Sequence, residues 1–196
     1  MIQGSKQKLL QAARELFYRN GFIATSVDDI IEAAKVSKSN FYYHFKSKED
    51  LGLAVLDQRE CELEVLLAGS LNNVDLSPRE RVRRFLTPIM DTEDGDDPAG
   101  CPFGNLIAEM AEHSETFRCR LSNMFTGLTS TIRAVIEEGQ RMGQFRTDLA
   151  ADAIAALMVQ TVQGAHLLAK CHKKREAYLR SVQALIQLIE SYPLSA

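Results

Sequence analysis

The stretch that decides the fold is residues 25–51, which read TSVDDIIEAAKVSKSNFYYHFKSKEDL. Thr25 or Ser26 is a candidate N-cap, with Asp28 or Asp29 three residues further on at the positive end of a helix dipole. Apolar residues at helical spacing follow and give this helix one buried face. The pattern predicts a short helix that begins here and ends within about ten residues.

A second short helix is predicted directly after a tight turn. Ser37 is its candidate cap, and Phe41 and Phe45 lie one turn apart, so both can pack inward. The polar side chains between them then point elsewhere: Lys38, Ser39, Asn40 and Tyr43. A helix, a tight turn and a second short helix form the helix-turn-helix unit, whose second helix enters the major groove of DNA.

The side chains of this second helix are suited to reading DNA. Lys38 can donate to guanine or to a phosphate, Asn40 can pair with adenine, and Ser39 can bond several base edges. Tyr43 is a further candidate for base contact. The candidate phosphate donors and turn residues complete the predicted DNA-binding set: Thr25, Ser26, Lys35, Ser37, Tyr42, His44 and Lys48.

The flanking segments complete an all-α chain of about nine helices. A helix over about 4–20 precedes the motif and stops at Asn20-Gly21, and Ser47 caps a helix over 48–69. Ser77-Pro78-Arg79-Glu80 marks another helix start. Further helices are predicted over 78–90, 102–112, 115–141, 149–170 and 174–191, with an acidic loop over 91–100. We therefore expect a DNA-binding domain over 1–47 and a larger helical domain over 48–196.

Charge and composition agree with this division. Residues 1–50 hold eight Lys or Arg against six Asp or Glu, whereas the remainder is net acidic and the whole chain carries −3. A basic head on an acidic body favours local phosphate contact. No apolar stretch is long enough to span a bilayer and the first residues lack a signal-peptide core, so we expect a cytoplasmic protein whose four cysteines are thiols.

The motif resembles the DNA-binding region of the tetracycline-repressor (TetR) family. The matching residues are Thr25, Val27, Ile30, Ala34, Val36, Ser37, Phe41, Tyr42, His44, Phe45, Lys48 and Leu51. Lys35 stands where many members have glycine, and a lysine at positive φ costs about 1 kcal/mol. GCPFGNLIAEMAE (100–112) is similar to a segment in one branch of the family. The resemblance implies a repressor that binds a palindromic operator as a homodimer and is released by a small molecule. It also implies that residues 48–196 are the ligand-binding and dimerisation domain.

The last two predicted helices carry the dimer hypothesis, because their apolar surface is wider than one core needs. Its residues are Ile154, Leu157, Met158, Thr161, Val162, Ala165, Leu168, Leu179, Val182, Leu185, Ile186 and Ile189, with Gly164 permitting close approach. Adaptable apolar side chains and two polar ones are candidates for lining an effector pocket: Phe103, Ile107, Met110, Met124, Phe125, Leu128, Met158, Gln160 and His166.

Two rival hypotheses remain open at this point. The chain could be an activator or architectural DNA binder without a ligand, or Cys101, at a helix start, could be a thiol sensor. Glu109 with His113, and Cys171 with His172, lack the four-ligand spacing of a zinc site. No phosphate-binding loop or nucleophile elbow is present in the sequence, so we expect no enzyme activity, no metal and no cofactor.

Overall fold

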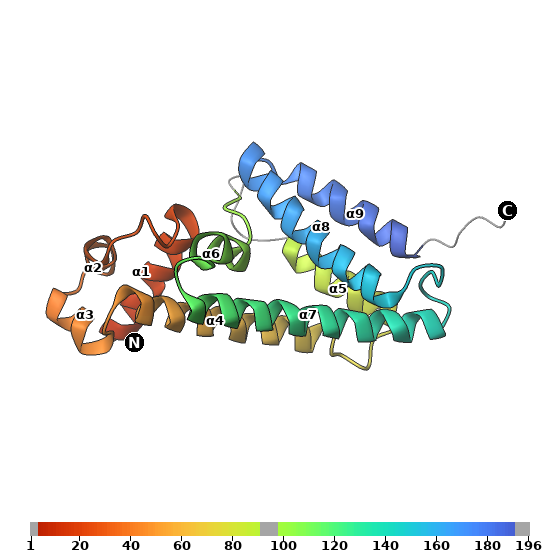
Figure 1. Ribbon diagram of the computed structural model, residues 1–196, viewed down its shortest axis with the longest axis horizontal. Coiled ribbons are helices and arrows are strands. Elements are labelled where there is room, and N and C mark those ends of the chain that lie inside the picture. Colours follow the sequence, from red (N-terminus) through yellow and green to blue (C-terminus); the bar gives the residue numbers. More distant parts are fainter. Residues whose placement is uncertain (1–3, 91–97, 191–196) are drawn as a thin grey trace. The chain divides into compact units, whose positions relative to one another are not determined.

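The computed structural model describes residues 4–90 and 98–190, which form nine α-helices and no strand (Figure 1). This confirms the predicted all-α architecture. The predicted acidic loop over 91–100 lies mostly outside the described residues. The helices are α1 (Ser5–Asn20), α2 (Val27–Ala34), α3 (Lys38–His44), α4 (Lys48–Gly69), α5 (Pro78–Met90), α6 (Pro102–Met110), α7 (Glu115–Arg141), α8 (Ala151–His172) and α9 (Glu176–Glu190).

Two compact packing units are present, and long helices pass from one to the other. The first unit comprises residues up to Glu62 together with Pro102–Arg120, and the second comprises Leu63–Cys101 together with the chain from Leu121 onward. Helix α6 and the first turns of α7 therefore pack with α1–α3. The functional division at residue 47 remains a prediction, since these units are defined by packing alone.

The core of the first unit is formed by α1–α3 and the start of α4. Phe41 and Phe45 are buried as the sequence predicts: Phe41 lies on the inner face of α3, and Phe45 caps the end of that helix one turn later. The main buried members of this core are Leu9, Leu10, Ala13, Ile30, Phe41, Phe45 and Leu51. This packing fixes α3 by its inner face and leaves the opposite face to solvent.

The second unit is built on a helical hairpin. Helices α8 and α9 lie side by side in opposite directions and share a core with α5 and α7 (Figure 1). Helix α8 ends at His172, two residues later than the sequence predicts, and Lys173 caps it with a φ of 53° in the left-handed region. It starts at Ala151 rather than about residue 149, because Ala150 is extended.

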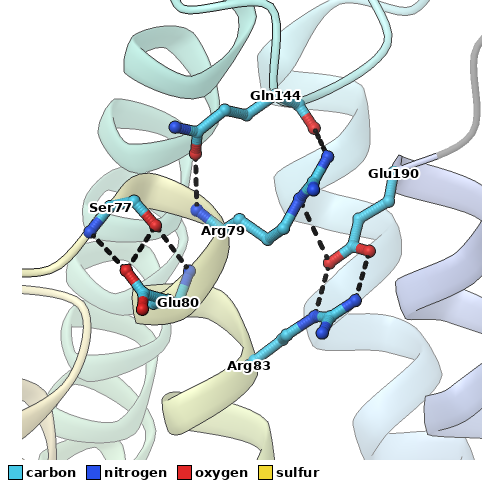
Figure 2. Close-up of polar contacts among 6 residues, drawn as sticks. All are labelled: Ser77, Arg79, Glu80, Arg83, Gln144 and Glu190. Carbon is cyan, nitrogen blue, oxygen red and sulfur yellow. Dashed lines mark hydrogen bonds and ion pairs between the residues drawn. The ribbon is translucent and has the colours of Figure 1, made fainter.

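Helix α5 begins with the predicted capping pair. The N–H of Glu80 donates to the Ser77 hydroxyl at 3.4 Å, and the N–H of Ser77 donates to the Glu80 carboxylate at 3.0 Å (Figure 2). These two bonds satisfy backbone donors that the helix itself leaves unpaired. The sequence signal and the structure thus agree at this helix start.

Ion pairs then fasten α5 to the end of α9. Arg83 donates to both carboxylate oxygens of Glu190, at 2.7 and 2.6 Å, and Arg79 lies 3.8 Å from the same carboxylate (Figure 2). The backbone N–H of Arg79 also donates to Gln144 Oε1 at 3.0 Å. A two-point guanidinium–carboxylate contact is geometrically specific, so it fixes the register of these elements.

Candidate nucleic-acid interface

Helix α2 is held at its start by a complete capping box. The N–H of Asp29 donates to Ser26 Oγ at 3.1 Å, while the N–H and the hydroxyl of Ser26 donate to Asp29 Oδ2 at 2.8 and 2.7 Å. These hydrogen bonds from Ser26 lower the pKa of Asp29 below its usual value. Ser26 and Asp29 are therefore the capping pair among the candidates in the sequence, and both donors of Ser26 are used inside the protein.

The turn between α2 and α3 depends on one left-handed residue. Lys35 has φ 52° and ψ 48°, and its N–H donates to the carbonyl of Glu32 at 3.1 Å. The N–H of Val36 donates to the carbonyl of Ile31 at 3.2 Å, which closes the end of α2. The positive φ expected where related sequences carry glycine is thus present, and the Lys35 side chain is exposed.

Helix α3 presents a polar outer face. Phe41 is fully buried, whereas Tyr42 is 54% and Tyr43 82% exposed. The other outward side chains on the helix are Lys38, Ser39 and Asn40, all of them exposed. Because the inner face is fixed by the core, these side chains project together, as an element that reads a groove requires.

Polar side chains at the start of α3 bond to one another. Asn40 donates through Nδ2 to Ser37 Oγ at 3.1 Å, and Ser37 Oγ lies 2.9 Å from Ser39 Oγ. Lys38 Nζ lies 3.2 Å from Asp28 in an exposed ion pair. Exposed pairs of this kind contribute little to stability, so they can be exchanged for contacts with DNA at small cost.

His44 closes the end of α3 against α1. Its Nε2 lies 2.7 Å from Ser5 Oγ, and its half-buried ring meets Tyr43 edge to face at 4.9 Å between centroids. The imidazole is thus part of a contact that positions Tyr43. A phosphate contact from His44 remains a prediction.

Thr25 and Lys48 have hydrogen-bond partners inside the protein, and a phosphate contact from either residue remains a prediction. Thr25 is only 2% exposed, and its hydroxyl donates to the carbonyl of Gly21 at 2.7 Å. Lys48 Nζ donates to the carbonyls of Phe22, Ile23 and Thr25 at 2.9, 3.2 and 2.9 Å. An ammonium group has three hydrogens, so these bonds use all of them. Both residues therefore hold the α1–α2 turn together.

Sequence reasoning missed the part that Glu109 plays in the same turn. Glu109, on α6, accepts a hydrogen bond from the N–H of Ile23 at 2.8 Å. Gly21 has φ 90°, and a Cβ at this position would lie 2.6 Å from a Glu109 oxygen. Burial lowers the pKa of Lys48, and the charge of Glu109 opposes that shift. No local pattern signals this contact, because the two segments are 86 residues apart in sequence.

The predicted pocket residues are divided between the two units. Phe103, Ile107 and Met110 belong to the first unit, where Phe103 lines a cavity of about 40 Å³, enough for a few water molecules. The others belong to the second unit: Met124, Phe125, Leu128, Met158, Gln160 and His166. Met158 is buried in the core, whereas Gln160 is exposed. The pocket assignment remains a prediction.

Cys101 lies in the second unit and is buried. Gln163 Nε2 donates to its sulfur at 3.5 Å. Burial in this manner is typical of an unreactive thiol, since reactive thiols are exposed and close to positive charge. Sensing by Cys101 therefore has no support from its exposure and remains a prediction.

Comparisons with known proteins agree with this geometry. Residues 78–185 match the tetracyclin repressor-like C-terminal domain, and residues 9–55 match the family model of bacterial regulatory proteins of the tetR family. The chain is 33% identical over 171 residues to the transcriptional repressor DhaR of Mycobacterium sp., covering 87% of this chain and 85% of the relative. The crystal structure of a TetR regulatory protein from Rhodobacter sphaeroides superimposes with a TM-score of 0.85 at 27% identity, covering 93% of this chain and 97% of that one.

A second relative resembles the head alone. The regulator QacR of Staphylococcus aureus is 47% identical over 55 residues, which are 28% of this chain and 29% of QacR. The helix-turn-helix and its outward polar face define a DNA-binding transcriptional regulator. The family matches make the assignment specific: the chain belongs to the tetR family of bacterial regulatory proteins, which are typically ligand-responsive repressors. Across the residues with described structure, no helix is both long and apolar enough to cross a membrane.

Proposed function

We propose that this protein is a repressor that binds a palindromic operator as a homodimer and leaves it when a small molecule binds. The outer face of α3 is the observation that carries the proposal. Its exposed lysine, hydroxyl, amide and phenol groups can donate to base edges and phosphates, and the aromatic core beneath holds them in register.

The contacts divide into two kinds. We assign base reading to Lys38, Ser39, Asn40 and Tyr43. We assign contact with the DNA phosphates to Tyr42, whose ring packs edge to face against Phe41 with 5.1 Å between centroids and is half exposed. Base contacts change sequence preference, whereas phosphate contacts change affinity on all sequences. One head makes few contacts, so two heads about 34 Å apart are needed for useful specificity.

The test is a fluorescence anisotropy titration on the DNA upstream of the protein's own locus. We expect Lys38→Ala and Tyr42→Ala each to weaken operator binding by at least about tenfold. Lys174→Ala, an exposed lysine between α8 and α9, is the matched control and should bind as the wild type does. If the wild type prefers no sequence over competitor DNA, and the α3 variants bind like the control, the proposal is wrong.

Helices α8 and α9 support a second copy of the chain as the partner. Ile154, Met158, Val162 and Ala165 of α8 are buried in the core, as one stripe of the predicted surface. A second stripe faces outward, with Leu157 37%, Leu167 65% and Leu168 50% exposed. Gly164 has open space where a Cβ would stand, so another helix can approach closely there.

The assembly state tests this surface directly. We expect Leu168→Glu to convert the dimer to a monomer in sedimentation velocity runs at micromolar concentration. Val65→Glu places the same charge on an apolar residue of α4 that is 74% exposed, and it should leave the dimer intact. Equal behaviour of the two variants would place the interface elsewhere.

A further inference from the structure

A buried polar cluster in the second unit lies outside the DNA-binding surface. Tyr178, on α9, is 4% exposed, and its hydroxyl has no hydrogen-bond partner among the described residues. Its ring stacks at a tilt on His166 of α8, with 4.6 Å between centroids. Buried hydroxyls are nearly always hydrogen-bonded in native proteins, so this one needs an explanation.

The Tyr178 hydroxyl belongs to the apolar core of the second unit, near Cys101 and Arg175. Cys101 is close enough to act on its ionisation, and Gln163 donates to the sulfur of that cysteine at 3.5 Å. Burial raises the pKa of Tyr178, and Cys101 adds to the effect, so the phenol keeps its proton and remains a donor. Burial also lowers the pKa of His166 to about 4, so its imidazole is neutral near pH 7. Arg175 is the nearby charge, and its opposing effect on Tyr178 ranks below those of burial and Cys101.

This chemistry selects the kind of molecule that would fit. A donor without a partner in an apolar surrounding is satisfied by an oxygen acceptor, such as a carbonyl. A charged ligand would lose its hydration on entering this apolar core, which is costly. We propose that Tyr178, with His166 against its ring, is the polar recognition point for an uncharged effector that carries a carbonyl oxygen. This proposal rests on the proposed function, because it assigns the effector site of the same regulator.

The proposal predicts that the Tyr178 hydroxyl contributes to ligand binding and lowers the stability of the ligand-free protein. Tyr178→Phe removes only the oxygen and keeps the ring against His166. We therefore expect its thermal midpoint without ligand to equal or exceed that of the wild type, because an unsatisfied buried group is removed. A midpoint lowered by several degrees would show that the hydroxyl has a structural partner, and this would overturn the proposal.

Binding is tested with three uncharged carbonyl probes (cyclohexanone, acetophenone and benzamide) and one anion, cyclohexanecarboxylate, by calorimetry on the full chain. We expect saturable binding of at least one uncharged probe, about tenfold weaker in Tyr178→Phe, since one hydrogen bond is lost. Tyr18→Phe, which removes a hydroxyl in the other unit, is the control and should bind the probe like the wild type. No binding of any uncharged probe, or tighter binding of the anion, would overturn the assignment.

Operator binding measured on the same samples separates the two proposals. If the wild type binds its operator and a saturating bound probe weakens that binding in a Tyr178-dependent way, both stand. If operator binding is specific but no probe affects it, the effector site is wrong and the proposed function is untouched. If no specific operator binding is found although a probe binds at Tyr178, the proposed function fails instead.

Discussion

Replacing Lys48 with methionine separates a structural role from a DNA-contacting one. Its ammonium donates to three carbonyls of the α1–α2 turn and lies 4.7 Å from the centre of the Phe22 ring. A hydrogen bond from a charged group contributes about 1.5–3 kcal/mol when buried, and less when water can replace it. Lys48 is half-buried, so we expect Lys48→Met to lower the free energy of unfolding by about 2–4 kcal/mol.

The assay is urea unfolding at one fixed protein concentration, because dimer stability depends on concentration. The expected loss corresponds to a midpoint lower by about 1–2 M urea. Lys38→Met is the matched control. Its side chain makes one exposed ion pair with Asp28, so its removal should change stability by less than about 0.5 kcal/mol.

The salt dependence of operator binding tests whether a lysine contacts phosphate, which the unfolding measurement does not. A lysine that contacts phosphate lowers the slope of log affinity against log salt by about 1 when it is removed, whereas a structural lysine leaves the slope unchanged. We therefore expect Lys48→Met to keep the slope of the wild type, whatever affinity it retains. Unchanged stability together with a reduced slope in Lys48→Met would refute the reasoning and restore the phosphate contact.

Two further predictions concern the second unit. In α7, Gly139→Ala would place a Cβ 2.1 Å from the buried ring of Phe145. We expect this variant to lose about 1–3 kcal/mol of stability in urea unfolding. Gly127→Ala is the control, because its Cβ would meet nothing within 4 Å, and it should be neutral or stabilising. The second prediction concerns His166, whose pKa of about 4 in the folded protein lies below the ordinary value of 6.5. As the pH falls, the unfolded chain therefore binds a proton at this histidine before the folded protein does. The free energy of unfolding should decrease as the pH drops from about 6.5 to 4. His166→Phe should remove this loss, which is at most about 1.4 kcal/mol per pH unit, and equal acid sensitivity of the two proteins would contradict it.

Local features of the fold could be predicted from the sequence because their determinants are adjacent in the chain. The Ser77–Glu80 capping pair and the inward packing of Phe41 and Phe45 both depend on spacings of three or four residues. Helix ends were predicted less accurately, because they also depend on backbone hydrogen bonds in the turns that follow. Helix α6 ends at Met110, two residues before the predicted end, since the turn residues Ala111, His113 and Ser114 close it by backbone hydrogen bonds.

Contacts between distant segments could not be predicted in this way. Glu109 meets the α1–α2 turn across 86 residues, and Arg83 meets Glu190 across 107. Every exposed charge is a possible partner until the fold brings two of them together. The hydrogen bonds of Lys48 could not be predicted for the same reason. Its position after the recognition helix predicts a phosphate contact, but the sequence does not reveal that its ammonium group donates to three carbonyls of the α1–α2 turn.

The proposed function assigns recognition and support to different residues of the head. Lys38, Asn40 and Tyr43 are exposed and make few contacts with the rest of the protein, so their replacement tests DNA binding in an intact fold. Lys48 and Glu109 hold the backbone of one turn, so their replacement would reduce DNA binding even where neither residue contacts DNA. A loss of operator affinity therefore identifies a contact only when the free energy of unfolding is measured on the same variant.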